Sequence, residues 1–326
     1  MKRLPLNTDL SGSPALLKNQ KGFALLLSLL IIFLLVVIIF EADFQIRSDL
    51  RAAGNFRDDL KAYYLSRSGI SAGEALLIDD AKNSNAYDGL DELWAFPIPE
   101  YPLGDGLLSG AIIDEERKIN INYLINQGSG KETVMEARRD QLVRLFMLLE
   151  VNPDLVDPII DWIDTDDEPR PFGAESPTYQ AREPGYSAKN GNMTTLSELR
   201  MVQGITQEIY AAISPYLTVY GGGKINVNTA DNLVLQSIDE GIDETEARRL
   251  IEKRPFQDAN AQDFKDELPE DVDGRIRTDG RVQWFTTRSK YFSLESRGQV
   301  NDTRKLTKAT VERTGIVTKL LYFRVE

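Results

Sequence analysis

The fold is decided by the stretch Lys21-Gly22-Phe23-Ala24-Leu25-Leu26-Leu27-Ser28-Leu29-Leu30-Ile31-Ile32-Phe33-Leu34-Leu35-Val36-Val37-Ile38-Ile39-Phe40. From Phe23 onward it contains no charged residue and no proline, and a helix needs about 20 such residues to cross a bilayer core. The preceding segment is basic, with one acid, Asp9, against Lys2, Arg3, Lys18 and Lys21. Because basic flanks stay in the cytoplasm, we predict one membrane-spanning helix with its amino end inside the cell.

Gly22 and Phe23 mark the boundary between the basic leader and the apolar helix. An uncleaved signal-anchor accounts for the long apolar run and for the absence of a small-residue exit after Phe40. A polar leader, a glycine at the membrane face and an aromatic residue that opens the helix also resemble the leader of type IV pilin-like proteins. That resemblance implies cleavage after Gly22 by a prepilin peptidase and a mature chain that starts at a methylated Phe23.

The 326-residue chain is acidic and has no cysteine and no histidine. Its formal net charge is -13, and without the leader, which carries +3, it would be -16. Such a charge repels nucleic acid and anionic lipid headgroups, although it also serves solubility. The lack of histidine excludes histidine-based triads, histidine acid–base catalysis and the usual zinc sites. We therefore expect a protein that is not an enzyme.

A helical pattern continues beyond the anchor, with apolar residues at spacings of three and four: Ile46, Leu50, Ala53, Phe56, Leu60, Tyr63, Tyr64 and Ala75. We expect an amphipathic stalk helix that packs on a sheet, then a loop over 87–106 and a strand over 107–113. Strand patterns return over 291–300, 305–313 and 318–325. This order predicts an α+β fold, in which a long N-terminal helix and an antiparallel sheet enclose one large insertion.

The motif Lys-aliphatic-Asn-aliphatic-Asn occurs twice, at 118–122 and at 224–228. The repeat suggests two related helical units, with each asparagine suited to cap the following helix. We expect small all-α bundles of the SAM or helix-hairpin-helix kind, and a weakly helical acidic loop over 258–280. In both hairpin-like turns the second glycine is replaced, by Thr206 and by Asp243, and nearby acids oppose phosphate binding.

The densest group of acids lies between residues 161 and 175, where two prolines oppose helix formation. Its carboxylates are Asp161, Asp164, Asp166, Asp167, Glu168 and Glu175. Ca²⁺ takes 6–8 oxygen ligands in flexible geometry, so a calcium loop other than an EF-hand is one interpretation. A solvated acidic loop, with Arg170 and Arg182 as partial counterions, is an equal alternative. A glycosidase pair is disfavoured because no aromatic-lined sugar cleft can be identified.

In combination, these features resemble the K family of minor pseudopilins of the type II, or general, secretion pathway. They are the leader, the anchor, the 161–175 loop, Leu196-Ser197-Glu198-Leu199 and Ile225-Asn226-Val227-Asn228-Thr229-Ala230. The resemblance implies a structural subunit that caps or initiates a pseudopilus tip with the minor pseudopilins I and J, and binds calcium in its insertion. It also implies a single-pass inner-membrane protein with a periplasmic C-terminal domain.

Leu27 stands at the fifth mature position, where most of the superfamily has a glutamate that pairs with a neighbouring subunit. Its absence fits a subunit with no neighbour above it, as at a tip, although an ordinary anchor would also have leucine there. Partner helices are expected to pack on Leu27, Leu50, Phe56, Leu60 and Tyr64. The alternative function, from another class, is a membrane-tethered nucleic-acid-binding protein that uses the helix-hairpin-helix units.

We expect the chain to be organised in six segments. They are a leader at 1–22, a membrane helix at 23–40, the stalk and first part of the pilin-like domain at 41–118, helical units at 119–222 and 223–285, and C-terminal strands at 286–326.

Overall fold

The computed structural model describes residues 20–83, 87–126 and 133–326. The predicted leader therefore lies outside the described residues, except for its last three. By its contacts the chain divides after Asp58 into two compact units. Helix α1 (Gln20–Lys82) is continuous, so the predicted stalk is confirmed and Gly54, Gly69 and Gly73 do not interrupt it.

The first unit is helical from Gln20 to Asp58. Its side chains from Phe23 to Phe40 are exposed, and the helix is long and apolar enough to cross a membrane. A helix that is apolar on all sides is stable only where lipid or protein surrounds it, so this segment requires such an environment.

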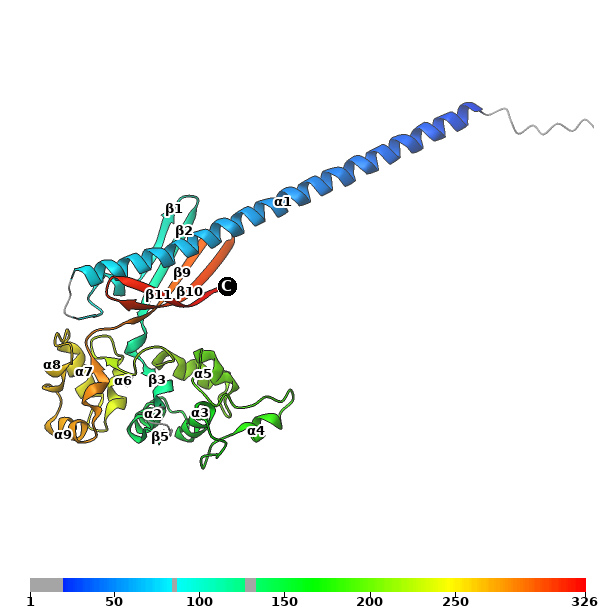
Figure 1. Cartoon of the computed structure of the whole chain (residues 1–326). Helices are drawn as coiled ribbons and strands as arrows, with labels where there is room; N and C mark the ends of the chain where they lie inside the picture. The colour runs from blue at the N-terminus through cyan, green and yellow to red at the C-terminus, as the bar shows by residue number, and fades with distance from the viewer. Residues whose placement is uncertain (1–19, 84–86, 127–132) are drawn as a thin grey trace, which may run out of the picture. The chain divides into compact units, whose positions relative to one another are not determined.

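The second unit contains a five-stranded antiparallel sheet, shown in Figure 1 with the order β1-β2-β9-β10-β11. The strands are β1 (Ile98–Leu103), β2 (Gly106–Asp114), β9 (Tyr291–Val300), β10 (Thr303–Thr314) and β11 (Val317–Val325). The predicted return of the C-terminal strands to the sheet begun near Leu107 is confirmed, since β9 pairs with β2.

One prediction about the sheet is wrong: residues 87–106 are not all loop, because they include β1. The region contains Pro99 and Pro102, which argue against a strand. Both prolines lie on an edge strand. Proline is tolerated there because its missing N–H group need not bond to a neighbouring strand.

Residues 59–82 of α1 lie along one face of the sheet (Figure 1), above a core that includes Ile70, Leu77, Trp94, Phe292 and Val311. The helix approaches the sheet closely at Gly298. A Cβ atom at Gly298 of β9 would lie 2.4 Å from the carbonyl oxygen of Ala62 and 2.6 Å from the backbone nitrogen of Ser66. Glycine at this position therefore sets the distance between helix and sheet.

Helices and short strands form the remainder of the second unit, around a separate hydrophobic core. The α-helices are α2 (Glu136–Leu148), α3 (Val156–Ile163), α4 (Ser176–Gln180), α5 (Gln207–Ile213), α6 (Asn232–Ile238), α7 (Glu244–Glu252), α8 (Gln262–Lys265) and α9 (Glu270–Thr278). Helices α8 and α9 correct the expected loop over 258–280. The predicted fold class, a long helix and an antiparallel sheet with a helical insertion, is confirmed.

Both copies of the repeated motif begin with a two-residue strand that closes a parallel pair. Strand β3 (Ile119–Asn120) pairs with β6 (Leu217–Thr218), and β7 (Ile225–Asn226) pairs with β8 (Phe285–Thr286). Each motif thus pairs with a segment at the end of the helical unit that the motif begins. This common closure is a structural counterpart of the repeat.

The motif's asparagines make equivalent contacts in the two copies. The side-chain oxygen of Asn120 accepts a bond from the backbone N–H of Asn122, and Asn226 does the same with Asn228, at 3.0 Å in both cases. Asn120 also caps the short helix that follows, as predicted. Asn226 does not, because α6 begins later and is capped by Asp231.

Candidate metal centre

Three of the six predicted carboxylates meet where α3 ends and α4 begins. Asp161 is in the last turn of α3, Asp164 is the residue that ends this helix, and Glu175 directly precedes α4. All three are buried, and each offers an oxygen within 4.8 Å of the others. Helix α3 ends at Ile163, and this end lets the chain fold back over Asp161.

The buried oxygens of this cluster are incompletely satisfied. Oδ1 of Asp161 and both oxygens of Glu175 have no hydrogen-bond partner among the described residues. Burial, followed by the nearby carboxylates of Asp161 and Asp164, raises the pKa of Glu175 to about 8. Burial also raises the pKa of Asp161 to about 6. Buried polar atoms are normally paired, so these oxygens are candidates for a partner other than the described residues.

The returning loop is held against Asp161 by its backbone. Oδ2 of Asp161 accepts a bond from the N–H of Arg170 at 3.1 Å. A Cβ atom at Gly173 would lie 1.8 Å from the same oxygen, so only glycine fits there. Trp162, which follows Asp161 in the chain, is buried and makes an edge-to-face contact with Tyr179. The loop is therefore anchored at both ends.

The other three predicted ligands, Asp166, Asp167 and Glu168, are exposed and do not join the cluster. Asp166 accepts a bond from the N–H of Glu168, and Asp167 accepts one from the side chain of Asn190. Asn190 was not predicted from sequence. Its Oδ1 atom is buried and has no hydrogen-bond partner within the described part of the chain, and an amide oxygen is a common calcium ligand. No local pattern marks this asparagine, which is remote from the loop in sequence.

The two predicted counterions are engaged elsewhere. Arg170 forms an ion pair with Asp157 at 3.3 Å. Arg182 donates to the hydroxyl of Tyr186 and to Gln203. Neither guanidinium forms an ion pair with the clustered carboxylates, so the solvated-loop interpretation describes only the exposed half of the loop.

The residues fit a hard divalent cation. The available atoms are carboxylate oxygens, two of them on the single side chain of Glu175, and these are the ligands that Ca²⁺ prefers. A bound cation would favour the ionised carboxylates and would satisfy the oxygens that lack hydrogen bonds.

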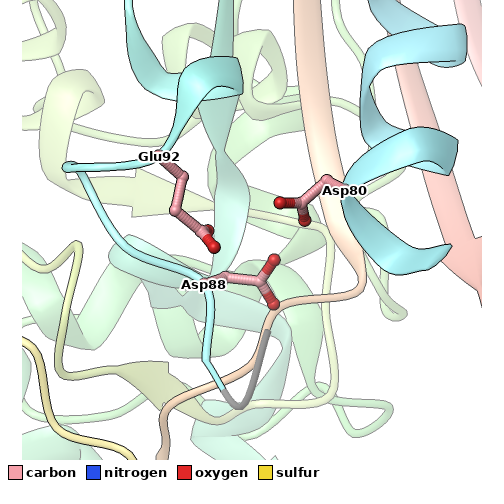
Figure 2. A group of neighbouring side chains, drawn as sticks. All are labelled: Asp80, Asp88 and Glu92. Carbon is pink, nitrogen blue, oxygen red and sulfur yellow. The ribbon is translucent and has the colours of Figure 1, made fainter. Parts of the chain in front are cut away.

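A second group of carboxylates, Asp80, Asp88 and Glu92, has a different character (Figure 2). Its side chains converge from the end of α1 and from the loop before β1. Arg313 lies between two of them, 2.8 Å from Asp80 and in contact with Asp88. Glu92 accepts bonds from the N–H of Gly89 and the indole of Trp94. All three carboxylates have partners within the chain, so we assign this cluster a structural role.

The hairpin-like turn of the second helical unit is bordered by ion pairs. Asp239, beside the turn at Gly241, pairs with Arg275 at 2.6 Å and with Arg281 at 2.9 Å. Because a carboxylate occupies both nearby guanidinium groups, no observation at this turn favours nucleic-acid binding.

The residues predicted to face partner helices are exposed: Leu27, Leu50, Phe56, Leu60 and Tyr64. Phe56 is the most exposed of them, at 71%.

Residues 117–222, which include the whole acidic loop, match the first-domain model described as "Type II secretion system (T2SS), protein K". Residues 225–273 match a second model with the same description. The chain belongs to the type II secretion system protein K family. The matches begin near the two copies of the repeated motif, and the candidate metal centre lies within the first.

Relatives in this family extend over most of the chain. Protein K of Aeromonas hydrophila is 28% identical over 306 residues, covering 88% of this chain and 91% of the relative. Protein K of Pseudomonas aeruginosa is 26% identical over 304 residues, covering 91% and 90%. The fold is similar to a chain of the GspK-GspI-GspJ complex from enterotoxigenic Escherichia coli, with a TM-score of 0.68 and 21% identity. The alignment covers 85% of this chain and 99% of that chain.

Proposed function

We propose that this protein K is a minor pseudopilin that assembles with pseudopilins I and J and caps or initiates the pseudopilus tip. The observation that carries the proposal is the exposed apolar side of α1, from the membrane stretch through Leu50, Phe56, Leu60 and Tyr64. Large exposed apolar surfaces generally mark sites of contact with protein or membrane. The similar fold in a solved GspK-GspI-GspJ complex supports the choice of partners.

Phe56→Asp is expected to reduce co-purification of the detergent-extracted full chain with co-expressed pseudopilins I and J by more than tenfold. A carboxylate buried between helices is costly unless it is paired. Asn55→Asp is the matched control, because it adds the same charge at the adjacent exposed position and removes no apolar surface. Equal recovery of I and J with both variants would contradict the proposed helix contact.

The same preparation tests processing of the leader. We propose that prepilin peptidase cleaves after Gly22, and that the mature chain spans the inner membrane once with its C-terminal domain in the periplasm. The basic residues before the apolar stretch support this orientation. The intact mass should correspond to a chain that starts at a methylated Phe23. A chain that retains Met1 in cells with active peptidase would reject the cleavage.

We also propose that the cluster of Asp161, Asp164 and Glu175 holds Ca²⁺, with Asn190 beside it as an additional oxygen donor. The support is the set of buried oxygens on Asp161 and Glu175 that have no hydrogen-bond partner among the described residues. The ion would tie the end of α3 to the start of α4 and so order the helical unit that contains them.

Calcium is expected to stabilise the full chain in detergent micelles by about 3 kcal/mol when its concentration is about 100 times Kd. Glu175→Gln should abolish this stabilisation, because it removes a charge and one carboxylate oxygen. Glu168→Gln, an exposed position in the same loop, should leave it unchanged. Thermal unfolding with calcium and with chelator measures both. Identical melting curves under the two conditions would refute calcium binding.

A further inference from the structure

The sheet ends in two free edges that differ in chemistry. Strand β1 carries Pro99 and Pro102, which have no N–H to donate, and its pairing with β2 shifts register between Ile98 and Tyr101. Strand β11 contains no proline. Prolines and irregular pairing are devices that prevent an edge from pairing with other chains. Strand β1 is protected by both, whereas β11 has neither from Tyr322 to Val325.

The unprotected stretch of β11 runs from Tyr322 to its end. The register with β10 shifts at Leu321, which is an extra residue between the partners of Thr310 and Val311. Beyond it the pairing is regular to the end of the strand. A docking strand therefore has a regular template over this part of the edge.

The backbone groups at this edge can be assigned. Leu306 and Glu326 exchange both of their backbone hydrogen bonds. In an antiparallel pair, hydrogen-bonded and non-hydrogen-bonded positions alternate. Tyr322 and Arg324 therefore bond to β10, whereas Phe323 and Val325 direct their N–H and C=O groups away from the sheet.

Exposed apolar side chains lie along β11 and in the turn before it. Between 38% and 62% of the surface of each is exposed: Ile316, Val317, Leu320, Leu321 and Phe323. An edge with free backbone groups and apolar side chains is the surface to which an extended peptide adds by β-augmentation.

Strand β11 carries two bases and no acid, in a chain whose formal net charge is -13. Lys319 and Arg324 flank the uncharged run of β11. The pair between Arg324 and Glu326 is exposed, at 3.2 Å, so a docking partner can replace it. Charge complementarity therefore favours a strand with acids at its ends.

A second copy of this chain fits the edge less well. The antiparallel register that pairs Leu320 with Phe323, and Leu321 with Tyr322, also places Lys319 opposite Arg324. Like charges directly opposite each other destabilise a strand pair. The net charge of -13 on each copy adds a general repulsion.

We infer that the free edge of β11 is a docking site for an extended segment of another protein. The segment adds as a sixth strand, with an apolar centre over Leu320, Leu321 and Phe323 and with acids facing Lys319 and Arg324. This surface is separate from the α1 contacts of the proposed function and does not depend on them.

The test uses the full chain in nanodiscs and the capped probe peptide Glu-Thr-Val-Thr-Val-Thr-Glu. Fluorescence anisotropy should show saturable binding, and hydrogen exchange should show protection of the amides of Phe323 and Val325. A peptide with Lys in place of both Glu residues should bind at least tenfold more weakly. A peptide N-methylated at alternate residues on its pairing edge should not bind.

Protein variants separate the contributions of backbone and charge. Phe323→Pro removes an outward N–H and should abolish binding, whereas Phe323→Thr keeps that N–H and should retain it within about fivefold. Lys319→Glu with Arg324→Glu should reverse the preference in favour of the lysine peptide. Absence of binding, binding that Phe323→Pro leaves unchanged, or concentration-dependent dimerisation through β11 would overturn the inference.

Discussion

Replacing Arg313 with methionine is expected to destabilise the sheet by about 3–5 kcal/mol, because it leaves buried carboxylates without their cation. The guanidinium of Arg313 contacts Asp80 and Asp88 and donates to the carbonyl oxygen of Ser289 at 3.0 Å. It also lies 4.7 Å from the ring centroid of Phe292. One side chain thus joins β10 to the end of α1, to the loop before β1 and to the segment that leads into β9.

Hydrogen exchange of β9 and β10 amides in the full chain, with and without the substitution, measures this loss locally. Arg324→Met is the matched control, since Arg324 is exposed and its loss should change stability by less than about 0.5 kcal/mol. Adding Asp88→Asn to Arg313→Met should recover part of the lost stability, because it removes one of the buried charges that the first substitution leaves without a cation. Equal stability of Arg313→Met and the control would show that the buried pair contributes nothing.

The second large effect is expected at Gly298, where alanine should cost about 3 kcal/mol by overpacking. The new methyl group would meet the carbonyl oxygen of Ala62 and the backbone nitrogen of Ser66. Backbone atoms of a helix cannot rotate away as a side chain can, so α1 must move off the sheet. Urea unfolding monitored by the fluorescence of Trp94, which packs on Phe292, reports this movement.

Gly274→Ala in α9 is the matched control. A Cβ atom there meets nothing within 4 Å, and alanine in a helix interior should stabilise the chain by up to about 1 kcal/mol. If Gly298→Ala also proved neutral or stabilising, the helix and sheet would be farther apart than the structure places them.

The local sequence pattern was sufficient to predict the elements that have a strong hydrophobic periodicity. The predicted strand over 291–300 has the same bounds as β9. The sequence did not predict strand β1 because it contains prolines, which are excluded from a central strand but tolerated in an edge strand. Which strand becomes an edge depends on pairing between distant segments, and periodicity does not contain that information.

At the candidate metal centre, the sequence predicted six ligands in one loop, and the structure brings three of them together. The six acids are chemically alike in a linear sequence, whereas the folded chain buries Asp161, Asp164 and Glu175 and leaves the others in solvent. Asn190 came only from the structure, because the contact with the loop crosses a long stretch of intervening chain. Asp88 and Arg313 likewise meet only after the sheet has formed.

The membrane helix, the stalk, the strand and helix types and the family resemblance were accessible from the order of residues, because each depends on composition or on spacing within one segment. The order of the strands, the free edge of β11, the buried acids and the closeness of Gly298 to α1 were decided by tertiary structure. These properties depend on which distant backbones approach each other and on which charges are removed from water, and both are set only when the segments pack.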